Sequence, residues 1–334
     1  MELNIVWFIL VGVLFIGLFF LEGFDWGVGM LTPFLGRGDD ERRQIINSIG
    51  PVWHGNQVWL ITAGGALFAA FPHVYATLFS GFYLALFLML FGLIIRGVSL
   101  EFRSKEADLS WRNMWDWLLA LGSFLPALLW GVAVCNLIAG TPIDAKMQYT
   151  GTFFDLLTPY TLVGGVAFVL VFIYHGASYL YIKLAGELAV RARSAALQVG
   201  LGTALACLAL FGLSFASTDM FKSVLSLMAF ILAILAFLAS YFLMFKQQGA
   251  LAFVLSGLTI AFTTISYFAG LFPRIMVSSL NPAWSLTVSN AAASPMTLKL
   301  MTIVAAVFVP IILIYQGWVY YRFSSRVQAK DLKY

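Results

Sequence analysis

The chain has 334 residues, of which 61% are hydrophobic and 10% are charged. Soluble domains are roughly 45–50% apolar and about 25% charged. This composition excludes a soluble globular protein and indicates a polytopic membrane protein. The formal net charge of +4 does not indicate nucleic-acid binding, because the Lys and Arg residues form no cluster dense enough to follow a phosphate backbone.

Nine apolar segments are long enough to cross a bilayer, which takes about 20 helical residues. They comprise residues 5–34, 45–71, 74–98, 114–140, 159–184, 195–216, 223–245, 249–272 and 298–321. The first segment lacks the basic start of a removable signal peptide and is expected to be retained. We therefore predict an all-α polytopic protein with nine transmembrane helices, in which residues 1–334 form a single integral membrane domain.

The basic residues are distributed unevenly between the two sides of the predicted membrane. If residues 35–44 lie in the cytoplasm, fifteen of the nineteen basic residues lie on that side. They are Arg37, Arg42, Arg43, Arg96, Arg103, Lys105, Arg112, Lys183, Arg191, Arg193, Lys246, Arg322, Arg326, Lys330 and Lys333. Lys and Arg near span ends are retained in the cytoplasm, so we predict an N-terminus outside and a C-terminus inside.

Two carboxyl groups lie deep in the first span, at Glu22 and Asp25. An ionised side chain near the bilayer centre costs about 2.5–3.5 kcal/mol, so such residues are rarely incidental. Their spacing of three residues places both side chains on one face of a helix. Two carboxylates that close repel each other, so at least one needs a proton or a partner.

The second span carries a polar group formed by His54, Asn56 and Gln57. The first two spans form a hairpin that turns near residues 39 and 40, so Asp25 is predicted to lie level with His54. A carboxylate beside an imidazole, with two amides to hold water, would suit a proton path from the cytoplasm. The same groups would equally suit a polar latch that joins two helices by hydrogen bonds. Both interpretations remain open at this point.

The remaining polar and aromatic residues of the spans favour structural roles. We expect His175 to be an interhelical hydrogen-bond partner, and Cys135 and Cys207 to be small buried hydrophobes. The sequence has no motif of a complete catalytic centre and no metal-binding motif. Aromatic residues near span ends are expected to be interfacial anchors; they include Tyr75, Trp284, Trp318, Tyr320, Tyr321 and the tryptophans of the segment 111–117.

Several segments resemble subunit II of the cytochrome bd-type quinol oxidases. The first is Glu-Gly-Phe-Asp-Trp-Gly-Val-Gly at residues 22–29, and the longest covers residues 47–72. Shorter segments agree in the same order, at residues 79–83, 112–117, 149–157, 285–290 and 294–301. Because these segments combine Trp, Asn and Gly where lipid would favour Leu and Val, the resemblance is specific, and it runs from the first span to the last.

The resemblance implies two four-helix bundles plus one peripheral helix, paired with a similarly folded subunit I. It places two b-type haems, one d-type haem and the quinol site in subunit I, so this chain is expected to bind no haem, although a structural quinone is found in some members. With its partner, and with small single-span accessory subunits in some members, the complex would oxidise quinol and reduce oxygen to water. The expected location is the bacterial plasma (inner) membrane.

The same resemblance implies roles for individual residues. Glu22, Asp25 and His54 would belong to a proton channel, and an oxygen route would begin near Trp59. Similar family members carry an acidic residue where this chain has His54. Two other classes of protein stay open as alternatives: a proton-coupled secondary transporter with the same three residues as coupling sites, and a purely structural membrane subunit.

Overall fold

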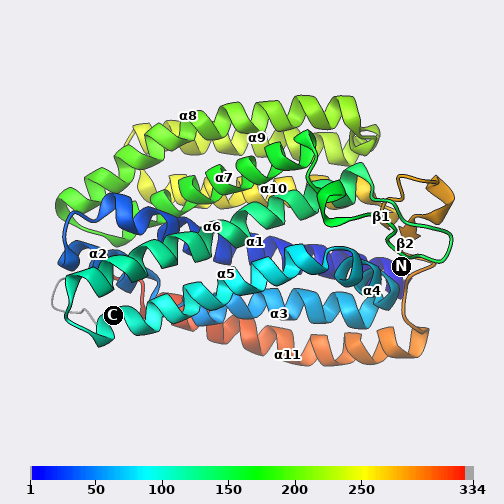
Figure 1. Ribbon diagram of the computed structural model, residues 1–334, viewed down its shortest axis with the longest axis horizontal. Helices are drawn as coiled ribbons and strands as arrows, with labels where there is room; N and C mark the ends of the chain where they lie inside the picture. The colour runs from blue at the N-terminus through cyan, green and yellow to red at the C-terminus, as the bar shows by residue number, and fades with distance from the viewer. Residues whose placement is uncertain (1, 328–334) are drawn as a thin grey trace.

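The computed structural model describes residues 2–327, so Lys330 and Lys333, counted above among the inner basic residues, lie outside the described range. The chain forms an elongated bundle of helices that run along its long axis (Figure 1). The first helix begins at one end of this bundle, and the last helix finishes at the opposite end. The all-helical polytopic class predicted from composition is confirmed.

Eleven α-helices make up most of the described chain. They are α1 (Leu3–Leu35), α2 (Asp39–Ile49), α3 (Trp53–Ala70), α4 (Pro72–Gly81), α5 (Tyr83–Phe102), α6 (Leu109–Ala139), α7 (Pro159–Lys183), α8 (Gly186–Ser217), α9 (Val224–Phe245), α10 (Gly249–Leu271) and α11 (Pro295–Arg322). A two-stranded antiparallel sheet of β1 (Arg274–Met276) and β2 (Leu286–Thr287) lies in the connection before α11 and was not predicted. Within the described residues, eight helices are long and apolar enough to cross a membrane: α1, α5, α6, α7, α8, α9, α10 and α11.

Two predicted spans each consist of two helices. The span predicted at 45–71 is divided between α2 and α3 at Gly50 and Pro51, because a proline lacks the N–H that would continue the helical ladder. The resulting α3 has 18 residues and carries the polar group of the second span near its start, which explains why it is not among the eight apolar helices. The span predicted at 74–98 is divided between α4 and α5, which meet at Phe82.

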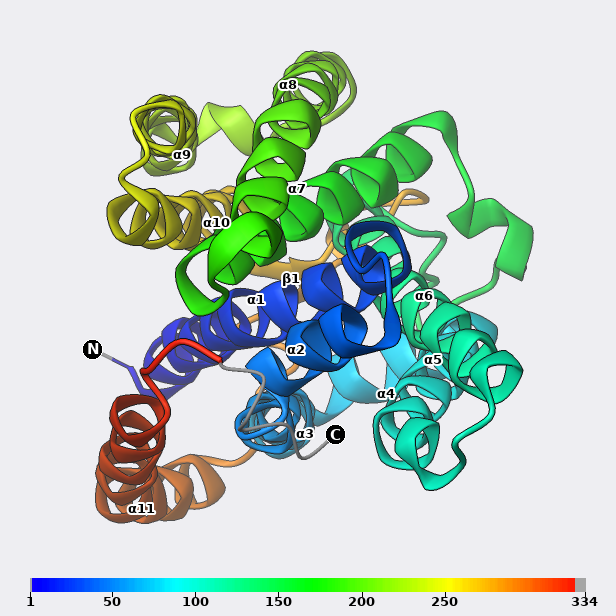
Figure 2. The ribbon, with the colours of Figure 1, turned by 90° about the vertical axis from the view of Figure 1, so that its left-hand side faces the viewer.

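Helix α1 lies at the centre of the bundle (Figure 2). Its glycines allow neighbouring backbones to approach closely: a Cβ atom added at Gly27 would lie 2.0 Å from the carbonyl oxygen of Phe172 on α7. A Cβ atom at Gly29 would likewise lie 2.0 Å from Ser123 Oγ on α6. This close packing encloses the C-terminal half of α1 in protein, so its two carboxyl groups are shielded from lipid.

A network of ion pairs fastens α2 to the start of α6. Asp116 is fully buried and accepts hydrogen bonds from Arg103 and Arg42, so the predicted aromatic belt at 111–117 also contains a buried acid. Arg103 also binds Asp39, which accepts a second bond from Arg112. Burial opposes ionisation of Asp39, but its bonds to Arg103 and Arg112 outweigh burial and hold the pKa of Asp39 below its ordinary value. The network fixes the end of the bundle where the predicted cytoplasmic connections lie.

Candidate functional site

Three charged side chains meet inside the bundle, although each comes from an apolar helix. Glu22 and Asp25 lie one turn apart on α1, and Arg96 of α5 approaches both. Arg96 Nη1 lies 3.3 Å from Glu22 Oε2, and Arg96 Nη2 lies 3.6 Å from Asp25 Oδ2. None of the three side chains is more than 1% exposed. We call these three residues the ion cluster.

The ion cluster has unbalanced charge and unused hydrogen-bonding capacity. One guanidinium neutralises one carboxylate, so two buried carboxyl groups and one arginine reach neutrality only with one added proton. Both carboxyl oxygens of Glu22, Oδ1 of Asp25 and all three guanidinium nitrogens of Arg96 form no hydrogen bond with another described residue. Buried polar groups with capacity to spare are where proteins hold internal water. An electrically neutral ion cluster therefore carries one proton on its two carboxyl groups.

Asn56, not His54, is the residue of α3 that meets Asp25. The Asn56 Nδ2 atom donates to Asp25 Oδ2 at 2.9 Å. His54 is exposed and its ring lies against that of Trp53, with 3.6 Å between ring centroids. His54 and Asn56 are two positions apart on α3. That spacing separates them by only about 3 Å along the helix axis but by about 200° around it. The predicted depth of Asp25 relative to α3 was therefore nearly right. The predicted contact between Asp25 and His54 is wrong, because the depth of a residue does not determine which side of its helix it lies on.

Two side chains of α11 contact Asn56 on the side away from Asp25. Tyr320 donates its hydroxyl to Asn56 Oδ1 at 2.6 Å, and Gln316 Nε2 lies 3.4 Å from the same oxygen. Gln316 Oε1 in turn accepts from the indole Nε1 of Trp59 at 2.9 Å. Trp59 therefore joins the polar site through Gln316. Gln57, the other predicted amide, is half-buried on α3.

Three members of this site were not recognised from the sequence. Arg96 was counted among the inner basic residues that set topology, but it is fully buried and paired with the carboxyl groups. Tyr320 was read as an interfacial anchor, and Gln316 was not singled out. A charged residue inside the apolar run of the third span was the available signal for Arg96, since an intramembrane charge implies a partner.

His175 takes the structural role expected of it. Its Nδ1 lies 2.7 Å from Ser256 Oγ, and its Nε2 lies 3.1 Å from the carbonyl oxygen of Phe20. The ring also stacks on Phe253 at a centroid distance of 4.7 Å. Because both ring nitrogens have protein partners, neither is free to ligate a haem iron. Among the described residues, no three His, Cys, Asp or Glu side chains are grouped as a metal site.

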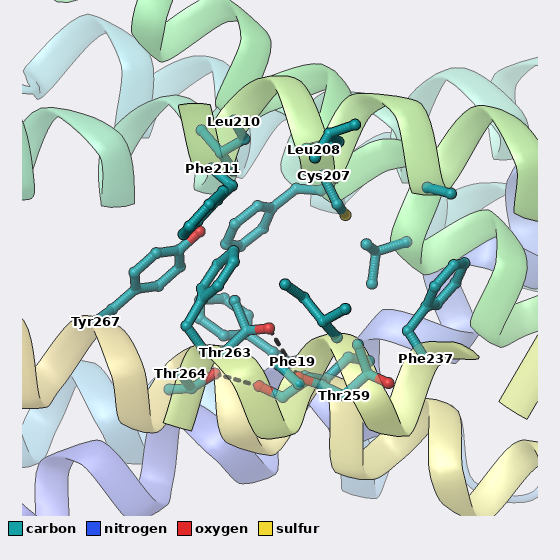
Figure 3. A pocket seen from close by; sticks show the side chains of 18 of the residues that line it. Phe19, Cys207, Leu208, Leu210, Phe211, Phe237, Thr259, Thr263, Thr264 and Tyr267 are labelled. Carbon is teal, nitrogen blue, oxygen red and sulfur yellow. Dashed lines mark hydrogen bonds between the residues drawn. The ribbon is translucent and has the colours of Figure 1, made fainter. Parts of the chain in front are cut away.

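An apolar cavity of about 250 Å³ lies between α7, α8, α9 and α10. Figure 3 shows Tyr267 at one end of it, with its hydroxyl directed toward Phe211, and Phe237 at the other end. Tyr267 is 4% exposed, and its hydroxyl has no hydrogen-bond partner among the described residues. Two lining residues, Leu208 of α8 and Leu238 of α9, are exposed on the outside of the bundle. The cavity thus reaches the outside of the bundle between α8 and α9.

Comparison with known proteins gives a consistent result over the whole chain. Residues 3–323 match the family model described as cytochrome bd terminal oxidase subunit II. The cytochrome bd ubiquinol oxidase subunit 2 of Bacillus subtilis is 42% identical over 332 residues, covering 99% of this chain and 98% of that protein. The cytochrome bd-I ubiquinol oxidase subunit 2 of Escherichia coli K12 is 42% identical over 372 residues, covering 99% and 97% of the two chains.

The fold also has a counterpart among solved structures. A chain in the structure of bd oxidase from Geobacillus thermodenitrificans superposes with a TM-score of 0.79 and covers 96% of this chain and 98% of its own. Sequence identity in that superposition is 17%, so this likeness concerns the fold alone.

Proposed function

Because the chain belongs to the cytochrome bd terminal oxidase subunit II family, we propose that its ion cluster conducts protons from the cytoplasm to the oxidase. The chain is a subunit of an oxidoreductase complex, a bd-type quinol oxidase, and subunit I is its partner. The secondary-transporter alternative is not supported. Reduction of oxygen to water consumes protons, and a subunit without a redox centre can serve that reaction by delivering them.

The observation that carries this proposal is the excess of buried carboxyl groups over buried cations in the ion cluster. A latch needs only matched hydrogen bonds, whereas an acid pair that shares one arginine holds a proton that can be exchanged. Asn56 extends the polar site toward α3. His54 and Gln57 lie within one turn of it, and we assign His54 to the entrance because its side chain is exposed.

We also propose nine membrane spans, arranged as two four-helix bundles and one peripheral helix. α3 would be the ninth span, since Figure 1 places it lengthwise beside α1. α1, α3, α5 and α6 would form one four-helix bundle and α7 to α10 the other, with α11 peripheral (Figure 2). The excess of basic residues at the α2 end supports an outer N-terminus and an inner C-terminus in the bacterial plasma membrane.

Reporter fusions test this topology directly. A periplasm-dependent reporter is expected to be active when fused after Lys222 and inactive when fused after Lys246, because these two residues lie at opposite ends of α9. A cytoplasm-dependent reporter at the same two sites serves as the control and should give the reverse pattern. Activity of the first reporter at Lys246 alone would invert the proposed orientation.

We place the b-type and d-type haems in subunit I. Both nitrogens of His175 have protein partners and His54 is exposed, so the described residues offer no paired ligand set for a haem. The purified chain alone is expected to show no Soret absorbance, and the intact complex to show it. A Soret band in the isolated chain that disappears in His175→Ala or His54→Ala would move a haem into this subunit.

A structural quinone would fit the apolar cavity of about 250 Å³ between α7, α8, α9 and α10. The lining suits an isoprenoid tail, and the unpartnered Tyr267 hydroxyl can donate to a quinone carbonyl oxygen. Tyr267→Phe removes that donor while keeping the ring, so the complex is expected to retain roughly five- to tenfold less quinone after purification. Quinone extracted per haem measures this, with Tyr315→Phe at an exposed position of α11 as the control. Equal quinone in both variants would remove Tyr267 from the proposal.

We also propose a route for oxygen through this chain. Trp59 lies where α11 approaches α1 and α3, and its ring fills the space beside Gly17. A second apolar cavity of about 70 Å³ lies further along α1, lined by residues such as Phe15, Leu67 and Trp130. An apolar gas would partition into such a path. We propose that this oxygen path begins at Trp59. Single-span accessory subunits would bind to the exposed apolar surfaces of the helices.

A further inference from the structure

We propose that two α11 side chains, Gln316 and Tyr320, are positioning residues for Asp25. They lock the Asn56 amide with its NH₂ group toward Asp25 and its oxygen toward α11. The lock sets how readily Asp25 ionises. This inference rests on the proposed proton path only for its consequence in turnover, because the lock itself is a matter of hydrogen-bond direction.

The direction of the chain of hydrogen bonds is fixed at Trp59. An indole N–H can only donate, so the Gln316 side chain must present Oε1 to Trp59, as the 2.9 Å contact shows. The Gln316 NH₂ group then faces Asn56 and can only donate in turn. Asn56 therefore turns its oxygen toward Gln316, and the assignment of its amide follows from the network rather than from an arbitrary choice.

Tyr320 reinforces the same orientation of Asn56. Its hydroxyl lies 2.6 Å from Asn56 Oδ1, the shorter of the two contacts to that oxygen. With Oδ1 held on the α11 side, Asn56 Nδ2 donates to Asp25 Oδ2 at 2.9 Å. A donor partner favours the ionised carboxylate over the protonated acid.

The flipped amide would reverse this preference. It would present Asn56 Oδ1 to Asp25, where a protonated carboxyl could donate to it. The same flip would set the NH₂ groups of Asn56 and Gln316 against each other, which leaves buried donors without acceptors. Removing the α11 partners removes that penalty, so protonated Asp25 becomes easier to accommodate.

Other titratable groups also act on Asp25 from the helices around it. They are Glu22 on the same helix, Arg96 on α5, Tyr179 on α7 and Tyr320 on α11. Gln316 carries no charge in any state, so Gln316→Met changes only hydrogen bonding and leaves all four groups in place. Tyr320→Phe removes a hydroxyl from a half-buried ring, and Tyr321→Phe, at an exposed neighbour, is its matched control.

The test follows the protonated carboxyl of Asp25 by infrared spectroscopy of the intact complex across pH, with the band assigned by its absence in Asp25→Asn. In Gln316→Met and in Tyr320→Phe the protonated fraction at a given pH is expected to rise roughly fivefold, the effect of one hydrogen bond. Tyr321→Phe should match the wild type. The pH dependence of oxygen consumption should move to higher pH in the same two variants.

The outcomes separate the lock from the proton path. A carboxyl band with wild-type pH dependence in both assembled variants would overturn the lock. A shifted band together with wild-type turnover in Asp25→Asn would keep the lock and refute the proton path instead. If Tyr320→Phe fails to assemble, Gln316→Met decides the matter alone, because it leaves the Tyr320 bond to Asn56 intact.

Discussion

Replacing Asp25 with Asn is expected to lower oxygen consumption per haem to roughly a tenth of the wild-type rate or less, while haem content stays normal. The loss of an essential proton-transfer group costs about 10²–10⁴-fold when no other group replaces it. Asparagine keeps the size of the side chain and an oxygen that can still accept from Asn56. The substitution therefore removes the titratable group and leaves the α1–α3 contact in place.

The control for this experiment is Asp40→Asn, which removes an acid on the exposed surface of α2. It should leave turnover unchanged. A polar latch predicts a different pattern, in which Asp25→Asn turns over like the wild type, or loses activity only in proportion to lost complex. Wild-type turnover per haem in Asp25→Asn would leave the latch as the remaining interpretation.

Arg96→Met is expected to prevent accumulation of the assembled complex. Removing one partner of a buried ion pair costs about 3–5 kcal/mol, because it leaves a buried charge uncompensated. Here two carboxyl groups would lose their only cation within the described residues. The amount of complex in the membrane and its thermal midpoint measure the effect, with exposed Lys105→Met as the control.

A second substitution tests whether charge balance is the cause. Adding Glu22→Gln to Arg96→Met removes one of the two carboxyl groups and leaves Asp25 free to take a proton. The double variant is expected to recover a large part of the lost complex, since adjacent charged groups are not additive. Failure of Glu22→Gln to improve on Arg96→Met would point to packing around the arginine rather than charge.

The fold was predictable wherever hydrophobicity decides the structure. Most long apolar runs became helices within a few residues of their predicted limits, and α6 and α11 begin earlier than predicted, each after a residue whose side chain caps the helix. α6 begins five residues before its predicted start, because Asp108 accepts from the backbone N–H of Trp111. The break at Pro51 was visible in the sequence, but the apolar run on both sides of it concealed the change from α2 to α3.

The sequence predicted the depth of the site residues in the bundle, but not the rotation of α3 about its axis or the residues that contact the carboxyl groups. Hairpin symmetry predicted that Asp25 lies level with His54, but the rotation of α3 about its axis turns Asn56, not His54, toward Asp25. The partner cation came from α5, which is about 70 residues away in the chain, and Tyr320 from the last helix. Such contacts depend on how helices cross, which a single sequence does not encode in any local pattern.

We propose that protons reach the oxidase from the cytoplasm through Asp25. Proton delivery through Asp25 is tested most directly by measuring proton uptake during a single turnover, in vesicles that hold the complex in known orientation with a pH indicator on the cytoplasmic side. Asp25→Asn is predicted to take up protons from that side at least roughly tenfold more slowly than the wild type, while oxygen still binds at the normal rate. Uptake at the wild-type rate in assembled Asp25→Asn complex would contradict the account.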